Sequence, residues 1–155
     1  MRRKEREITD SEIIADIINR SDVCHVAFSD NNSPYIIAMN FGFIDARPPL
    51  VYFHCANEGH KIDVLKRNNK VAFMFDTDHQ LVTGARGCDF SMKYSSVAGT
   101  GEIYIVESEE EREKGLNSIM KQYSGKSDFI FDPATMTRTT ILKLVVFSIT
   151  GKMTG

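Results

Sequence analysis

The distribution of apolar residues along the chain predicts mostly β-strands. Short runs rich in Val, Ile, Phe and Tyr, several of them alternating with polar residues, are separated by clusters of turn-forming residues. One such cluster, residues 29–34, consists of two Ser, one Asp, two Asn and a Pro. We expect strands over residues 23–28, 35–44, 50–56, 70–75, 94–106 and 139–149, with a further brief strand at 81–83.

Other segments show the three-to-four-residue spacing of amphipathic helices. Thr9 and Glu12 form a capping box, and the segment after it places four isoleucines on one apolar stripe. A second capping box, Ser108 with Glu111, precedes a longer stripe that ends before Gly125. Both segments are predicted to be helices that pack on a core.

The order of these segments favours a mainly β fold. Strands follow one another with few helices between them, which argues against a doubly wound α/β fold. A small antiparallel barrel of six or seven strands with peripheral helices fits best, in a single domain spanning residues 1–155. Gly99 and Gly101 share one face of their strand, which indicates sheet curvature or a flat ligand, and curvature is the simpler explanation. Residues 127–138, which include Pro133, are expected to be irregular.

Composition narrows the classes of function. A formal net charge of −2 gives no electrostatic basis for binding nucleic acid. The basic start at residues 1–4 is followed by no long apolar run, so we expect neither a signal peptide nor a membrane anchor. The three cysteines cannot all pair within the chain and none lies in a C-x-x-C motif, which indicates reduced thiols and a cytoplasmic location. Cys24 and Cys55 fall on strands as small core residues, and Cys88 falls in a loop.

The histidines and cysteines do not show the spacing of a metal site. Neighbouring residues on a strand point to opposite faces, so Cys24-His25 and His54-Cys55 each supply at most one ligand to a face. No residue pattern identifies a base for a cysteine nucleophile. The glycines form neither a phosphate loop nor a dinucleotide-binding motif.

One stretch is suited to an anion. At residues 50–65 a strand runs into a short helix, and His60 and Lys61 fall on the first turn of that helix. Helix N-termini carry unpaired N–H groups and a positive dipole, so two cations there are unfavourable unless an anion binds. Ser95 and Ser96, at the start of a later strand, could add hydroxyl groups. Solvated surface side chains explain the same residues equally well.

The same stretch resembles a known family. Residues 50–56 and 58–63 look like the core motif of the pyridoxamine 5′-phosphate oxidase-related FMN-binding split barrels, and are most similar to the nitroimidazole-reductase-like branch. Three further segments agree in order. Residues 35–43 resemble the second strand of the family, 94–101 its S-V-x-x-x-G strand, and 150–152 its T-G-K ending. The resemblance therefore covers nearly the whole chain.

The resemblance implies a homodimer that binds FMN in a cleft between two split barrels. His60 and Lys61 would hold the FMN phosphate, close to the backbone of Gly59. His54 and Cys55 would line the ribityl and ring region. The remaining implied contacts are Met39, Asn40, Phe41 and Gly42 along the edge of the isoalloxazine, and Ser95, Ser96 and Val97 on its other side, toward phosphate or ribityl.

The chain also departs from the family pattern. Ala38 stands where many relatives carry proline. Gly59 and His60 stand where pyridoxamine 5′-phosphate oxidases proper usually carry Ser or Thr and Arg. No basic cluster matches the substrate-phosphate site of those oxidases, which argues against the vitamin as substrate.

These features lead to one main expectation and two alternatives. We expect an FMN-dependent oxidoreductase that reduces a small molecule such as a nitroaromatic, with a nicotinamide nucleotide as the electron donor. An FMN carrier, store or redox sensor fits the same residues. A haem-binding split barrel with His25, His54 or His60 as axial ligand fits less well, because the helix start suits a phosphate. No side chain stands out as a catalytic acid or base.

Overall fold

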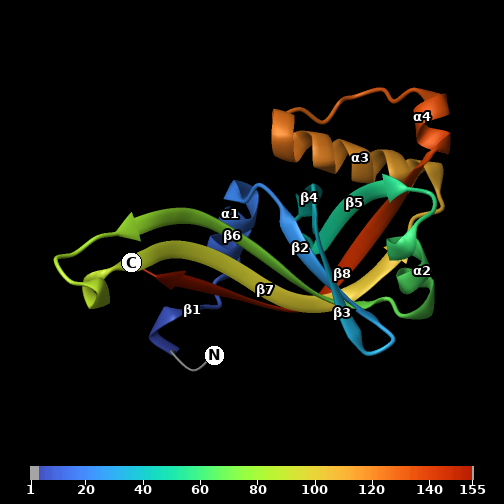
Figure 1. Ribbon diagram of the computed structural model, residues 1–155. Helices are drawn as coiled ribbons and strands as arrows, with labels where there is room; N and C mark the ends of the chain where they lie inside the picture. The colour runs from blue at the N-terminus through green and yellow to red at the C-terminus, as the bar shows by residue number, and fades with distance from the viewer. Residues whose placement is uncertain (1–3, 155) are drawn as a thin grey trace.

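A computed structural model describes residues 4–154 of the chain (Figure 1). Its centre is a sheet of eight strands in the order β3-β2-β6-β7-β8-β5-β4, with β1 paired to β8, and every pairing is antiparallel. The strands are β1 (Glu7–Ile8), β2 (Cys24–Asp30), β3 (Ser33–Met39), β4 (Phe41–Ile44), β5 (Leu50–Ala56), β6 (Lys70–Val82), β7 (Ser91–Ile105) and β8 (Thr139–Thr154). The helices are α1 (Ser11–Arg20), α2 (His60–Arg67), α3 (Glu109–Ser124) and α4 (Pro133–Thr137), with 3-10 turns η1 (Lys4–Arg6) and η2 (Gly87–Asp89). The expected mainly β split barrel with peripheral helices is confirmed.

A single residue closes the barrel. The strand expected over residues 35–44 is broken at Asn40, because Met39 pairs with Cys24 of β2 whereas Phe41 pairs with Phe53 of β5. The strands on either side of Asn40, β3 and β4, are the two ends of the strand order. The sheet must therefore curl until its two edges meet at this residue.

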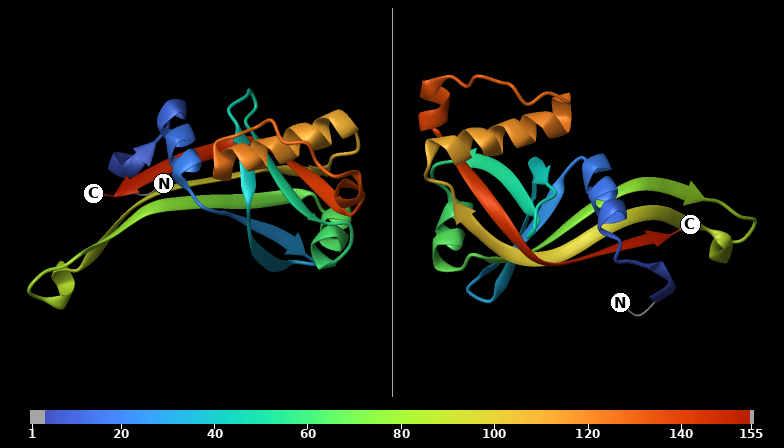
Figure 2. Two further views of the ribbon diagram at one scale, coloured as in Figure 1. Left: turned by 90° about the horizontal axis from the view of Figure 1, so that it is seen from above. Right: turned by 180° about the vertical axis from the view of Figure 1, so that it is seen from behind.

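The sheet curves mainly along its three long strands, β6, β7 and β8. Strand β6 continues to Val82, so the expected brief strand at 81–83 is part of a longer one, with a register shift between Thr77 and Gln80. The pairing of β7 with β8 shifts register between Thr100 and Gly101. A Cβ atom on Gly101 would lie 2.2 Å from the Val145 carbonyl oxygen, so only glycine permits the two backbones to approach this closely. The glycine pair therefore marks curvature, as expected. The far ends of β6 and β7 form a hairpin that extends away from the rest of the molecule (Figure 2).

Helix α3 covers one end of the barrel and stabilises the aromatic core below it. The rings of Phe41 and Phe75 lie edge to face with their centroids 4.8 Å apart. The Phe41 amide donates to the hydroxyl of Tyr123 on α3 at 3.1 Å. Burial of such large side chains contributes about 1.5–3 kcal/mol each. A contiguous set of buried side chains from the strands and from α1 and α2 completes this core.

Helix ends agree with the sequence in one case and differ in another. Ser108 accepts from the Glu111 amide and Gly125 ends α3 in the left-handed conformation, as expected. The N-cap of α1 is Asp10 and not Thr9, because the Asp10 carboxylate accepts from the amides of Glu12 and Ile13. A carboxylate suits the positive end of a helix better than a hydroxyl.

Two segments near the C-terminus are more regular than expected. Residues 133–137 form the short helix α4, which begins at Pro133 with Asp132 as N-cap. The last strand continues to Thr154, where it still pairs with Tyr94 of β7. In the described part of the chain, none of the helices has the length and apolar character needed to cross a membrane.

Candidate functional site

The end of β5 leads into α2 through an open loop. Gly59 is the N-cap of α2, with φ 125° and ψ 168° and no side-chain capping bond. Glycine adopts this positive φ without the steric cost that other residues would carry. No atom lies within 4 Å of the place where a Cβ would stand on Gly59. The amides of Ile62 and Asp63 donate to the Gly59 carbonyl oxygen, whereas those of His60 and Lys61 have no acceptor among residues 4–154 and are available to an anion.

His60 is held by its neighbours. Its Nε2 atom lies 3.2 Å from the Oδ2 atom of Asp30, and its ring lies edge-on to the ring of Tyr35, 4.9 Å between centroids. The second oxygen of Asp30 accepts from Arg67, at the other end of α2, at 2.6 Å. Asp30 thus connects both ends of α2 to the β2–β3 hairpin and fixes the direction of the imidazole.

The Lys61 ammonium is close enough to the end of β5 to affect the pKa values of two side chains there. Partial burial, followed by the nearby Lys61 ammonium, lowers the pKa of His54. Burial raises the pKa of Cys55, and Lys61 opposes that change. Among residues 4–154, no acidic side chain forms an ion pair with Lys61. The Lys61 ammonium therefore lies near His54 and Cys55 without a direct ionic partner among the described residues.

The segment Met39 to Gly42 contributes mainly backbone. The side chains of Met39 and Phe41 are buried in the core, and that of Asn40 is exposed between the two strands. A Cβ on Gly42 would lie 2.2 Å from Ser118 Oγ and 2.4 Å from the Ile119 backbone nitrogen. The space that a side chain at Gly42 would need is therefore occupied by α3. The assignment of these four residues to a flavin edge stays a prediction.

Only one of the three residues Ser95, Ser96 and Val97 faces the outside of the sheet. Ser95 and Val97 are buried, at 3% and 0% exposure, whereas Ser96 lies on the outer face. There it opens into a hollow of about 530 Å³. The hollow is lined by Met74, Asp76, His79, Tyr94, Ser96, Ala98, Thr150 and Lys152.

Of the eight lining residues only Ser96 was predicted from the sequence as a site residue, and three of the others, His79, Tyr94 and Lys152, contact one another. Lys152 donates to the hydroxyl of Tyr94 and its ammonium lies 4.6 Å from the centroid of that ring. The rings of His79 and Tyr94 are stacked, with an interplanar angle of 16°. The T-G-K ending marks Lys152 in the sequence, but only the strand register pairs it with Ser96 and so places both on one face.

The predicted site residues form two groups at opposite ends of β8. His54 pairs with Ile141 of β8, and Ser96 pairs with Lys152, which comes 11 residues later on the same strand. An extended strand rises about 3.3 Å per residue, so the two groups are on the order of 30 Å apart. A single chain therefore does not bring His60 and Lys61 into contact with Ser96.

A histidine pair shares one carboxylate beside the hollow. His25 Nδ1 lies 3.4 Å from one oxygen of Asp76, and His79 Nε2 lies 3.1 Å from the other. Within residues 4–154 there is no group of three or more His, Cys, Asp or Glu side chains that could hold a metal ion. All three cysteines have free thiols, and Cys24 is buried and Cys88 exposed, as expected from their positions in the sequence.

Comparison with known proteins agrees with this architecture. Residues 10–153 match the family model described as pyridoxamine 5′-phosphate oxidase. The chain is also similar to a solved structure, a candidate 5-nitroimidazole antibiotic resistance protein from Bacteroides thetaiotaomicron. The two are 32% identical over 95% of this chain and 86% of that one, with a TM-score of 0.82.

The chain belongs to the pyridoxamine 5′-phosphate oxidase family. More distant members of the fold include the flavocytochrome Anf3 from Azotobacter vinelandii, at 16% identity over 100% of this chain and 72% of that one, with a TM-score of 0.82. A protein from Mycobacterium smegmatis that binds FAD and haem is 14% identical over 96% of this chain and 73% of that one, with a TM-score of 0.83. A comparison with curated protein sequences gives no match. The family resemblance of the motifs is confirmed.

Proposed function

We propose that this pyridoxamine 5′-phosphate oxidase-family protein binds FMN and acts as a cytoplasmic oxidoreductase that reduces a small molecule such as a nitroaromatic. The observation that carries the proposal is the unbalanced positive charge of Lys61 at the open N-terminal end of α2. A phosphate there would meet the first-turn amides of the helix and the Lys61 ammonium together. Charge-assisted hydrogen bonds of this kind are about twice as strong as neutral ones.

The other residues at this end of the barrel orient what binds. His60, fixed by Asp30, presents its exposed ring beside the same amides. His54 and Cys55 line the adjoining strand end, where the lowered pKa of His54 favours a neutral imidazole that can donate or accept a hydrogen bond. A bound flavin would supply reversible hydride and electron transfer, with a nicotinamide nucleotide as the proposed electron donor.

A second copy of the chain would complete the site. Between the rows of Lys70 and Asp76, the middle of the outer face exposes small or apolar residues without charge: Ile36, Ala38, Ala72, Met74, Ala98, Thr100, Ser148 and Thr150. Exposed apolar patches of this kind mark association surfaces. This uncharged face borders the hollow with Ser96 and Lys152, so a homodimer through it would bring that hollow toward the His60 and Lys61 end of the partner. In such a dimer, the two groups of site residues that lie far apart along β8 in one chain would come together across the interface.

Binding is tested by titration of the purified protein with FMN, and in parallel with FAD, following quenching of flavin fluorescence. We expect saturable binding of FMN, weakened about tenfold or more by Lys61→Ala and little by His25→Ala, since only Lys61 meets the phosphate. A colourless protein that quenches neither flavin would refute the proposal. Equal affinities of the two variants would refute the phosphate assignment.

Turnover is tested separately from binding. Reduction of the bound flavin by NADH or NADPH, followed by reoxidation with a nitroaromatic, would support the oxidoreductase. Tight binding with no such turnover would favour an FMN carrier or sensor.

The dimer is tested by light scattering. Ala98→Glu places a charge in the middle of the uncharged face and should give monomers. Ala85→Glu, in the exposed hairpin, should leave the dimer intact.

A further inference from the structure

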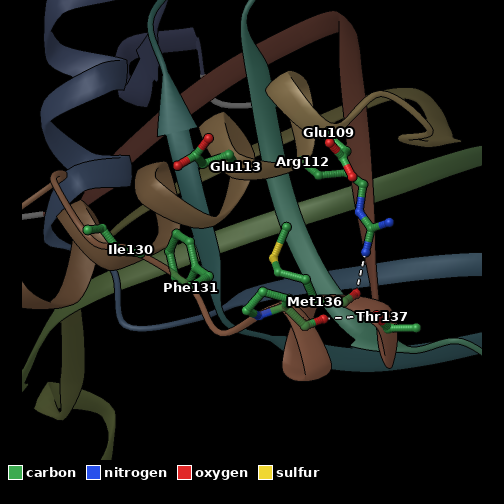
Figure 3. Close-up of a pocket in the computed structure, with 8 residues that line it drawn as sticks. Glu109, Arg112, Glu113, Ile130, Phe131, Met136 and Thr137 are labelled. Carbon is green, nitrogen blue, oxygen red and sulfur yellow. Dashed lines mark hydrogen bonds between the residues drawn. The ribbon is translucent and has the colours of Figure 1, made fainter.

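A cavity of about 430 Å³ lies between helix α3 and the arm formed by residues 126–138 (Figure 3). It is separate from both groups of the proposed flavin site. Its size falls in the range of pockets for small organic molecules. The lining residues are Glu109, Arg112, Glu113, Ile130, Phe131, Pro133, Met136 and Thr137.

The two walls differ in chemistry. Glu109, Arg112 and Glu113 follow the i, i+3, i+4 spacing that places side chains on one face of α3. The arm supplies the apolar side of the cavity through Phe131 and Met136. Figure 3 shows Glu113 and Phe131 on one side of the cavity and Arg112 with Glu109 on the other. The cavity thus combines a flat apolar surface with charged groups at its edges.

Arg112 already forms hydrogen bonds with two backbone carbonyl groups of the protein. Arg112 Nη2 donates to the carbonyl oxygen of Met136 and to that of Thr139, the latter at 2.8 Å. These bonds hold the end of the arm against α3. The Nε atom of Arg112 is buried, and no group among residues 4–154 accepts from it. The guanidinium therefore closes one end of the cavity and holds the arm against α3.

The carboxylates of Glu109 and Glu113, in contrast, are free to contact a ligand. Among the described residues, neither Glu109 nor Glu113 forms an ion pair, and neither side chain makes a hydrogen bond. Two carboxylates against one guanidinium leave the cavity with a net negative charge. A cation placed against the face of Phe131 would also gain from the ring quadrupole.

We propose that this cavity is a binding site for a small organic cation with a flat apolar body, of the class of aromatic amines and amidines. The flat body would lie between Phe131 and Met136, and the cationic nitrogen would meet the carboxylates. None of the cavity's lining residues belongs to the proposed cofactor site.

Three isosteric probes test the charge preference. The fluorescence of 4-aminobenzamidine rises in apolar sites, and 4-aminobenzamide and 4-aminobenzoate have the same ring with a neutral and an anionic group. We expect saturable binding of the amidine at roughly millimolar concentration or below, with the amide weaker and the benzoate weakest. Equal or tighter binding of the benzoate would overturn the proposal, as would an amidine signal that does not saturate by about 10 mM.

Substitutions locate the binding. Glu113→Gln and Glu109→Gln should each weaken the amidine about three- to tenfold with little effect on the amide, since each removes one carboxylate. The matched control is Glu110→Gln, in the same first turn but outside the cavity. An equal loss in Glu110→Gln would show general charge attraction only and would overturn the proposal. Phe131→Ser should weaken all three probes, because it removes the ring face.

Discussion

The Nε2 atom of His60 lies 3.2 Å from the Oδ2 atom of Asp30, so the histidine at the proposed phosphate site already faces a carboxylate. The same carboxylate accepts from Arg67 at 2.6 Å. Asp30 therefore orients His60 and at the same time places a negative charge beside any bound anion. The first effect would strengthen FMN binding and the second would weaken it, and a substitution of Asp30 can separate them.

Asp30→Asn should strengthen FMN binding about fivefold. The amide keeps the shape and hydrogen-bonding capacity of the side chain but removes a charge whose repulsion of a nearby phosphate is on the order of 1 kcal/mol. Fluorescence titration at low and high salt checks this, and the gain should shrink as salt screens the repulsion. Asp128→Asn, which removes an equal charge from the exposed arm, is the control. Weaker binding in Asp30→Asn would mean that orientation of His60 matters more than repulsion.

The protonation of His54 should respond to Lys61 and to FMN. Burial and Lys61 hold the pKa of His54 below its ordinary value of about 6.5. The unfolded chain then binds more protons than the folded chain between the lowered pKa and about pH 6.5. Stability from this group therefore rises with pH through that window and is lost as the pH falls.

NMR titration of the His54 ring measures this directly. Lys61→Met should raise the pKa of His54 toward the ordinary value without restoring it fully, because burial remains the larger cause. Saturation with FMN should also raise it, since a phosphate near Lys61 offsets the repulsion. An unchanged pKa in Lys61→Met would show that the ammonium does not face the strand end.

Gly42→Ala should destabilise the fold by about 2–3 kcal/mol, because the added Cβ has no space and must displace α3. It would meet Ser118 Oγ at 2.2 Å and the Ile119 backbone nitrogen at 2.4 Å. Urea denaturation measures the change as a lower midpoint with an unchanged slope. Gly87→Ala is the matched control, since no atom lies within 4 Å of its Cβ position and its φ is not positive. A small effect in Gly42→Ala would mean that α3 can shift without cost.

Local patterns in the sequence were sufficient for most of the fold. The strand at residues 50–56 and the Ser108 and Gly125 ends of α3 depend on neighbouring residues, and the structure has them where the sequence predicts them. The break at Asn40 could not be predicted from its neighbours. It exists because Met39 and Phe41 pair with strands distant in sequence, β2 and β5, and only the closed barrel brings those pairings together.

In the candidate site, too, contacts between neighbouring residues could be predicted from the sequence, whereas contacts between distant strands could not. His60 and Lys61 are adjacent in sequence, so their meeting at one helix start follows from local structure. Ser96 could not be placed relative to them without knowing the register of β8, which pairs His54 with Ile141 and Ser96 with Lys152, 11 positions later. Lys152 was visible in the T-G-K ending, but its contact with Tyr94 depends on that same register.

Asn57 should control the stability of the arm that carries α4. Its side chain donates to the Thr137 carbonyl oxygen at 2.8 Å and accepts from the Thr140 hydroxyl at 2.9 Å. No side chain in residues 121–138 is fully buried, so polar contacts of this kind hold the arm in place. Loss of both bonds in Asn57→Ala should cost about 1–2 kcal/mol locally.

Hydrogen exchange is the measurement that isolates this contact. Amides of α4 should exchange about tenfold faster in Asn57→Ala, while the most protected amides of β7 and β8 keep their rates, because opening of the arm does not require unfolding of the sheet. Asn19→Ala, which removes an amide that makes no side-chain hydrogen bond in residues 4–154, should leave α4 unchanged. Since Asn57 lies in the loop that leads to Gly59, FMN bound at α2 should slow exchange of α4 in the unmodified protein and do so less in Asn57→Ala. Unchanged exchange of α4 in Asn57→Ala would show that the contacts of Arg112 and Asn117 with the arm are sufficient to hold it.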